Sequence, residues 1–169
     1  MSADGYDWSQ FSTTFFYPID IRTAYQAWAT PAGLQSFFIE TAAVRSWTGE
    51  TRRPDESMAT GDRYRWIWRH GLTLEGTVLE ATPDRSLAFT FGSMRCNVAF
   101  SSVEPETTRV DLLQTDIPDT PEGRVMGHLN CRSCWIFFMT NLSSIFVTGV
   151  DLRDADPSRV SSMEVTFPD

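Results

Sequence analysis

The spacing of hydrophobic positions changes along the chain, and its first stretch predicts a strand followed by two helices. Residues 11–19 alternate and are rich in aromatic and β-branched side chains, which indicates a β-strand. Apolar residues then recur at helical spacing over 21–28, with Asp20 as an N-cap. Pro31 ends this helix because proline disfavours the helical conformation of the preceding residue, and a second short helix follows.

Between residues 42 and 117 apolar side chains recur at every second position, as in strands with one buried face. The predicted strands are 42–47, 63–70, 72–80, 86–91, 96–102 and 108–115. Gly71, Pro83 and Pro105 mark turns between successive strands, and residues 48–61 are predicted to form a polar loop. Strands that run consecutively and are segregated from helices indicate an α+β domain.

A long helix is predicted over 122–148, where helical spacing returns, with Gly149 as its C-cap. Its expected buried side is marked by Leu129, Trp135, Met139, Leu142 and Phe146. The predicted organisation is an extension at 1–10, one domain at 11–150 and a tail at 151–169. For the tail, a late strand at 163–167 and a loosely ordered chain are both open.

Composition and charge disfavour several classes of function. The chain of 169 residues has a formal net charge of −8, and such a surface repels nucleic-acid phosphates and anionic lipid heads. No run of about 18 apolar residues occurs, so no membrane insertion is predicted. The 3 cysteines and an N-terminus without a signal-peptide pattern indicate a reducing, cytoplasmic compartment.

Aromatic side chains gather on one face of the predicted sheet. Tyr64, Trp66, Trp68 and His70 alternate along one strand, and Phe89 and Phe91 alternate along another. Rings on such a face either fill a core or line an apolar cavity, in which indole, phenol and imidazole groups orient a ligand.

The opposite face of the strand at 63–70 is basic, with Arg63, Arg65 and Arg69. One interpretation is a solvated face whose arginines pair with Glu75 or Glu80, and exposed pairs of this kind are common. The other interpretation is a site for an anion or a partner protein.

Metal and redox chemistry on the long helix is disfavoured by geometry. His128, Cys131 and Cys134 are ligand types that zinc prefers. On a helix the first and the last of them lie about 240° apart, so the three side chains cannot converge. We therefore predict no metal, no cofactor and no Cys131–Cys134 disulfide.

Catalysis would depend on His70, with Glu75 or Glu80 as the carboxylate partner of a general base. The chain has no nucleophile elbow, no phosphate-binding glycine loop and no zinc-protease motif. A binding domain is therefore preferred over an enzyme, and a cyclase-like or hydrolase-like activity of His70 is the alternative.

Several short motifs resemble one known family in their order and spacing. They are AYQAW at 24–28, GDRYR at 61–65, LEGTVLE at 74–80, RSLAFTF at 85–91, TRV at 108–110 and CWIFFMTNL at 134–142. The chain resembles the activator of heat-shock-protein ATPase homologues, within the START-like, birch-pollen-allergen-like (SRPBCC) superfamily. This resemblance implies a helix-grip fold, in which a curved antiparallel sheet of six or seven strands wraps a long C-terminal helix. A fold alone does not fix an activity.

The resemblance also implies a cavity between the sheet and the long helix, because relatives bind lipids, steroids, polyketides or hormones. The expected ligand is a small hydrophobic or amphipathic molecule. The residues expected to bind it are Phe37, Phe38, Tyr64, Trp66, Trp68, His70, Phe89, Phe91, Trp135 and Met139. A homodimer and a chaperone partner remain open as further partners.

Overall fold

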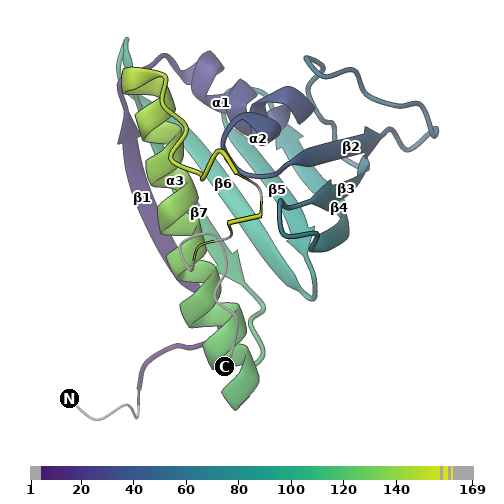
Figure 1. Cartoon of the computed structure of the whole chain (residues 1–169), viewed down its shortest axis with the longest axis vertical. Helices are drawn as coiled ribbons and strands as arrows, with labels where there is room; N and C mark the ends of the chain where they lie inside the picture. Colours follow the sequence, from purple (N-terminus) through teal and green to yellow (C-terminus); the bar gives the residue numbers. More distant parts are fainter. Residues whose placement is uncertain (1–4, 157, 160, 162–169) are drawn as a thin grey trace.

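Seven antiparallel strands form one curved sheet in the computed structural model of the chain, which describes residues 5–156, 158–159 and 161 (Figure 1). The strands are β1 (Phe11–Tyr17), β2 (Thr41–Arg45), β3 (Arg63–Ile67), β4 (Thr73–Thr82), β5 (Ser86–Phe91), β6 (Met94–Glu104) and β7 (Thr107–Thr115). Their order in the sheet is β1-β7-β6-β5-β4-β3-β2, so β1 and β2 are the two edges. The predicted α+β helix-grip class is confirmed; the strand considered at 163–167 lies outside the described residues.

Two short helices, α1 (Ile21–Ala29) and α2 (Pro31–Phe37), connect β1 to β2. The Asp20 side chain caps α1 by accepting a hydrogen bond from the backbone N–H of Thr23 at 3.0 Å, as predicted. Thr30 is both the C-cap of α1 and the N-cap of α2. Its backbone N–H donates a hydrogen bond to the Gln26 carbonyl at the end of α1, and its Oγ1 accepts one from the Gly33 N–H at the start of α2. Pro31 occupies the first position of α2, where its missing N–H costs nothing.

The strand predicted at 63–70 ends earlier, at Ile67. The N–H of Trp68 bonds to the Leu72 carbonyl at 2.9 Å, and Gly71 supplies the positive φ of 86° that this hairpin requires. The chain therefore turns at Arg69 and His70, so neither residue lies in the strand. The prediction that Arg69 shares a strand face with Arg63 and Arg65 is wrong for this reason.

The long helix is continuous but changes type. Its first part, η1 (Gly123–Asn130), is a π-helix, and α3 (Cys131–Thr148) is an α-helix that ends at Gly149 with a φ of 73°. Figure 1 shows this helix lying across one face of the sheet beside β1 and β7. Among the described residues, no helix is long and apolar enough to cross a bilayer.

Leu129 was expected on the buried side of this helix, and that prediction is wrong, because 51% of its surface is exposed. The helix comes closest to the segment after β7 at Gly127, where an added Cβ would lie 2.8 Å from Cγ2 of Ile117. The close backbone approach at Gly127 brings its neighbour His128 into the interior and leaves Leu129 on the outer side.

Trp135 on α3 contacts both the helix pair and the sheet. Its ring stacks on Phe38 with centroids 4.7 Å apart and on Trp28 with centroids 5.7 Å apart. Its indole N–H donates to Oε1 of Gln114 on β7 at 2.9 Å, so the only polar atom of the ring is satisfied although it is buried. One side chain thus connects the long helix, the helix pair and the sheet.

We predict that Trp135→Ala lowers the free energy of unfolding by roughly 3–5 kcal/mol, because it leaves a large cavity and removes the indole donor from the buried Oε1 of Gln114. Urea denaturation followed by circular dichroism measures this loss. Trp47→Ala is the matched control: Trp47 is 78% exposed, so its loss should stay within about 0.5 kcal/mol. Equal effects of the two substitutions would contradict the assigned packing.

Candidate functional site

A cavity of about 190 Å³ lies between the start of α3 and two hairpins of the sheet. Its walls are Phe38, Trp68, His70, Leu72, Thr73, Leu74, Phe91, Gly92, Met94, Asn130, Cys131, Cys134, Trp135 and Phe138. The β3–β4 hairpin, the β5–β6 hairpin, the end of α2 and the junction of η1 with α3 each contribute to the wall. The lining is mostly apolar, with a few polar side chains among the rings.

The structure divides the ten predicted binding residues into two groups. Phe38, Trp68, His70, Phe91 and Trp135 line the cavity. Phe37, Tyr64, Trp66, Phe89 and Met139 are buried but do not line it.

The second group forms a layer behind the cavity. The rings of Tyr64 and Trp66 stack with centroids 3.9 Å apart, and Trp66 meets Phe89 edge-on at 5.2 Å. Trp66 also packs edge-on against Phe38, whose ring lines the cavity. These residues therefore support the cavity wall rather than face the cavity.

Sequence reasoning missed part of the helical wall. Cys131, Cys134, Trp135 and Phe138 have the i, i+3, i+4, i+7 spacing of one helix face, and all four line the cavity. The spacing was available in the sequence, but the two cysteines were interpreted as small apolar side chains of a packed helix, with metal or redox chemistry as the alternative, and not as the lining of a cavity. The wall residues Leu72, Gly92 and Met94 carried no such signal, because hairpin ends are not periodic.

His70 lines the cavity, and its Nδ1 accepts a hydrogen bond from the Leu72 N–H at 3.2 Å. The carboxylates proposed as its partners lie elsewhere. Glu75 is exposed and pairs with Arg65 at 3.5 Å, and Glu80 accepts a hydrogen bond from Ser86. The geometry gives no support to a general base made of His70 with Glu75 or Glu80.

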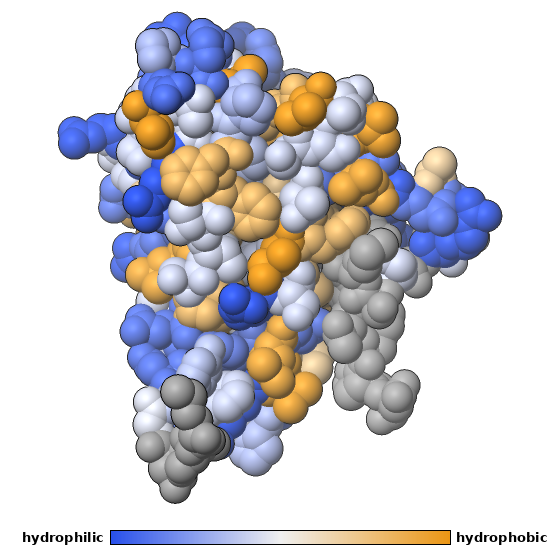
Figure 2. Space-filling view, turned by 90° about the vertical axis from the view of Figure 1, so that its left-hand side faces the viewer, coloured by the Kyte–Doolittle hydropathy of each residue, from blue (hydrophilic) through white to orange (hydrophobic). Residues whose placement is uncertain are grey.

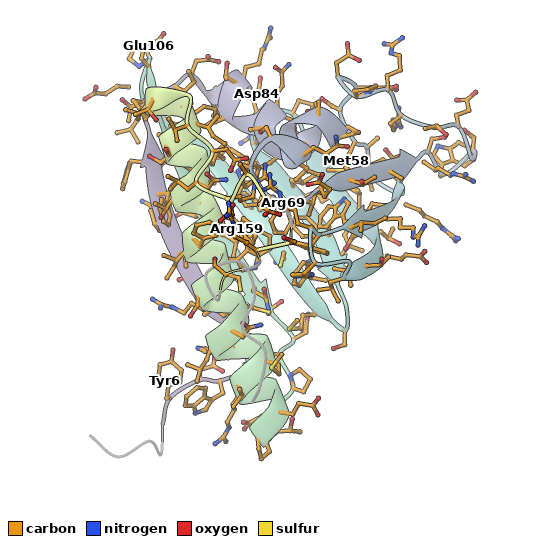
Figure 3. The ribbon with its side chains drawn as sticks, in the orientation of Figure 1. Tyr6, Met58, Arg69, Asp84, Glu106 and Arg159 are labelled. Atoms are coloured by element: carbon orange, nitrogen blue, oxygen red, sulfur yellow. The ribbon has the colours of Figure 1, made fainter. Side chains whose placement is uncertain are left out.

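His128 and the two cysteines of the long helix lie in different parts of the molecule. His128 is buried with its Nε2 2.9 Å from the Tyr6 hydroxyl and its Nδ1 3.1 Å from the Trp8 carbonyl oxygen. Figure 3 places Tyr6 beside the lower part of the long helix, where it holds the N-terminal segment. Cys131 and Cys134 instead line the cavity, and burial raises the pKa of the Cys131 thiol. In the described part of the chain, no group of three or more His, Cys, Asp or Glu side chains is placed to hold a metal ion.

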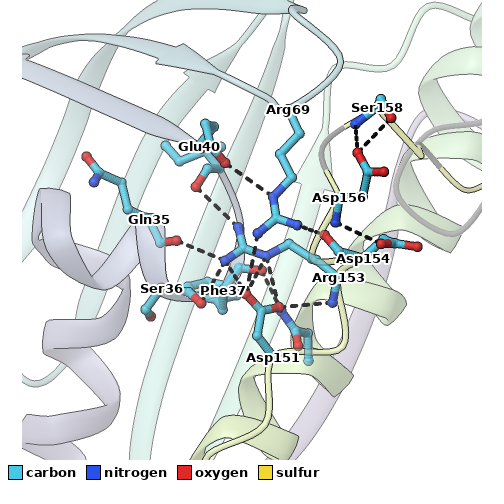
Figure 4. Close-up of polar contacts among 12 residues, drawn as sticks. Gln35, Ser36, Phe37, Glu40, Arg69, Asp151, Arg153, Asp154, Asp156 and Ser158 are labelled. Carbon is cyan, nitrogen blue, oxygen red and sulfur yellow. Dashed lines mark hydrogen bonds and ion pairs between the residues drawn. The ribbon is translucent and has the colours of Figure 1, made fainter.

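A polar network fixes α2, whose end contributes Phe38 to the cavity (Figure 4). The Arg153 guanidinium donates to the carbonyls of Gln35 and Ser36 at 3.0 and 2.9 Å. The Asn141 amide donates to the Phe37 carbonyl at 3.0 Å. Carbonyls of a last helical turn have no partner within the helix, so these donors cap α2 from distant parts of the chain.

Asp151 holds this network together. It accepts hydrogen bonds from the Nη2 of Arg153 at 2.7 Å and from the Asn141 amide at 3.0 Å. Partial burial raises the pKa of Asp151, but the hydrogen bonds from Arg153 and Asn141 outweigh it, so the pKa lies below its usual value. Arg69, next to the wall residues Trp68 and His70, reaches the same network through Glu40, the Asp154 carbonyl and Asp151.

The curved sheet, the two short helices after its first strand and the long helix over an apolar cavity define the START-like helix-grip class. The family model described as "Activator of Hsp90 ATPase homolog 1-like protein" matches residues 19–146. The chain belongs to this family. No curated protein matches the chain significantly.

Three solved structures illustrate how similar the fold of this chain is to that of other proteins. A Staphylococcus saprophyticus protein has a TM-score of 0.68 at 18% identity, over 86% of this chain and 97% of its own. The Aha1 dimer from Colwellia psychrerythraea has a TM-score of 0.64 at 16% identity, over 83% and 97% of the two chains. An HSP90 activator from Plasmodium falciparum has a TM-score of 0.58 at 17% identity, over 81% and 95%. At these identities the likeness establishes the fold.

We predict that Asp151→Asn flattens the acid dependence of stability. A carboxyl whose folded-state pKa is lowered contributes stability that is complete above its unfolded pKa, near 3.8, and is lost as the pH falls through the folded value. The unfolding free energy of the wild type should therefore fall more steeply than that of the variant below about pH 4. Urea titrations at a series of pH values measure both slopes, and parallel slopes would contradict the role of Asp151.

Proposed function

We propose that the protein binds a small apolar molecule in the cavity between α3 and the sheet. The observation that supports this most is a partly open cavity lined almost entirely by rings, aliphatic side chains and thiols. Close-packed cores leave few voids larger than a water molecule, so an apolar cavity of this size in a small domain is a candidate ligand site.

The size of the cavity narrows the class of ligand. Its volume of about 190 Å³ lies below the usual range of drug-sized sites, which begins near 300 Å³. It is somewhat larger than an engineered apolar cavity of about 150 Å³ that binds benzene. A molecule of one or two fused rings therefore fits better than a steroid or a long acyl chain.

Polar side chains at the wall suggest that the ligand carries one polar end. His70 and Thr73 come from the β3–β4 hairpin, and Asn130 comes from the opposite wall at the end of η1. Rings bind the flat body of the ligand, and these groups orient its polar atom.

We expect 1-naphthol to bind with a Kd of tens of micromolar, or roughly −6 kcal/mol, when titrated into the protein in a calorimeter. Binding should also raise the melting temperature, because the ligand binds only the folded state. Palmitate, whose chain exceeds the cavity, should give neither effect.

Cys134→Phe and Leu74→Phe fill the cavity from opposite walls and should each abolish binding of 1-naphthol. Ala99→Phe is the matched control, because Ala99 is exposed and lies outside the cavity wall. If the two filled variants bind as well as the control, or if the wild type binds no probe, the proposal is wrong.

A second candidate function is self-association through the outer face of α3. Residues 133–148 contain no charged side chain, although the chain has a net charge of −8. Ser133, Ile136, Thr140, Ser143 and Val147 follow the alternating spacing of four and three residues that lines coiled-coil seams, and none of them is fully buried. Figure 2 shows apolar and weakly polar groups over the side of the molecule formed by β1 and α3.

We call these five residues the α3 seam. Because the seam carries no charge, it cannot form ion pairs with a charged partner, whereas a second copy of the same face can pack on it without burying a charge. The dimer reported for the Colwellia psychrerythraea protein of the same fold is consistent with such a pairing. We therefore propose that two copies of the chain pack along α3.

Sedimentation velocity should give a particle of twice the 19.2 kDa chain mass for the wild type. Ile136→Glu and Val147→Glu place charges in the seam and should shift the particle to the monomer. Val103→Glu, at a residue 54% exposed on β6, should not. A monomeric wild type across the accessible concentration range would rule out this function and leave the cavity proposal untouched.

A further inference from the structure

The outer face of β2 and β3 carries a group of arginines that the proposed functions leave unexplained. In the register of the sheet Arg45 on β2 lies directly opposite Arg63 on β3. Arg65 follows on the same face of β3, beside Glu75 on β4. We call Arg45, Arg63 and Arg65 the arginine cluster. In Figure 1 these strands form the edge of the sheet farthest from β1 and α3.

This placement is electrostatically unfavourable for the isolated protein, because like charges directly opposite in an antiparallel pair repel each other. Among the residues that the structure describes, neither Arg45 nor Arg63 has an ion pair or a hydrogen bond to its side chain. Arg65 has only the exposed contact with Glu75 at 3.5 Å. Other arginines have close carboxylates, as in the pairs of Arg52 with Asp62 and Arg153 with Asp151. Four arginines outside the cluster, Arg22, Arg85, Arg95 and Arg132, also have no ion pair among the described residues, but none of them is placed directly opposite another arginine in the sheet.

The cluster borders an open depression of about 570 Å³, whose other lining residues are Ala43, Tyr64, Glu75, Gly76 and Thr77. Glu75 is the one acidic residue of this lining, and it pairs with Arg65. Opposed residues of a strand pair have Cβ atoms about 5 Å apart, and the next residue on the same face lies about 7 Å along the strand. Three guanidinium groups can therefore reach one ligand. Each offers a planar fork of donors that matches a carboxylate or phosphate.

We propose that this depression binds an acidic peptide segment of a partner protein. The depression is wider than one phosphate needs, and all three guanidinium groups are on an open sheet face rather than in a buried anion pocket. Trp47, two residues after Arg45, is exposed outside the depression, and its ring is suited to contact an apolar side chain of such a peptide. At physiological salt, charges more than about 8–10 Å away are largely screened, so the local cluster outweighs the acidic remainder of the surface.

Fluorescence anisotropy with a dye-labelled oligoglutamate peptide tests the proposal, with the equivalent oligoglutamine peptide as the comparison. The wild type should bind the glutamate peptide at least about tenfold more tightly, and the difference should shrink as salt screens the contacts. Arg45→Gln and Arg63→Gln should each weaken binding about fivefold, as expected for one exposed charged contact. Arg22→Gln, at an exposed arginine on α1 outside the cluster, should bind like the wild type.

Melting temperatures separate lost binding from lost folding. Because Arg45 and Arg63 repel each other, neutralising either residue should leave the melting temperature unchanged or raise it. Equal binding by the cluster variants and Arg22→Gln, or no preference for the glutamate peptide, would overturn the proposal. Inorganic pyrophosphate is the competitor, matched to the glutamate peptide in total concentration of negative charge. If it displaces the peptide at an equal or lower concentration, the site prefers a small anion and the proposal is wrong.

Discussion

The contact between Trp135 and Gln114 is the constraint on which the arrangement of the molecule depends. Gln114 is fully buried on β7, and its amide donates to the Gly127 carbonyl of the π-helix at 3.1 Å while its oxygen accepts from Trp135. A buried amide with unmet donors or acceptors would cost about 1–3 kcal/mol, so this residue fixes the height and the rotation of the long helix over the sheet. The same indole ring then stacks on Phe38 and closes one wall of the cavity.

A second set of polar contacts fixes the adjoining part of the wall, at Phe38. With the seven residues Pro31–Phe37, α2 is too short to be stable alone, and its terminal carbonyls are capped by Arg153 and Asn141. The cap joins α2 to α3 and to the segment that follows it, so Phe38 is held between two elements that are distant in sequence. The two stacked rings of this wall, Trp135 and Phe38, are therefore fixed by buried polar groups as well as by apolar packing.

Local signals in the sequence were sufficient for much of the fold. Alternation located the strands, Asp20 and Pro31 bounded the first helices, and Gly149 ended the long one, because each signal acts within a few residues. The cavity wall was predicted only in part, since alternation decides which face a ring occupies but not how closely a helix approaches that face. That approach depends on Gly127 meeting Ile117 and on Gln114 meeting Trp135, and neither contact has a sequence period.

The change from π-helix to α-helix falls at the cavity wall, where Asn130 and Cys131 lie on either side of the junction. π-helical turns are rare and occur frequently at functional sites. Here the π-helix is held from outside the cavity, by Gln114 at the Gly127 carbonyl and by Tyr6 and Trp8 around His128. A ligand that presses on Cys131 must act against these contacts, so the N-terminal segment and the buried amide limit how far the cavity can widen. This restraint favours small ligands independently of the volume of the cavity.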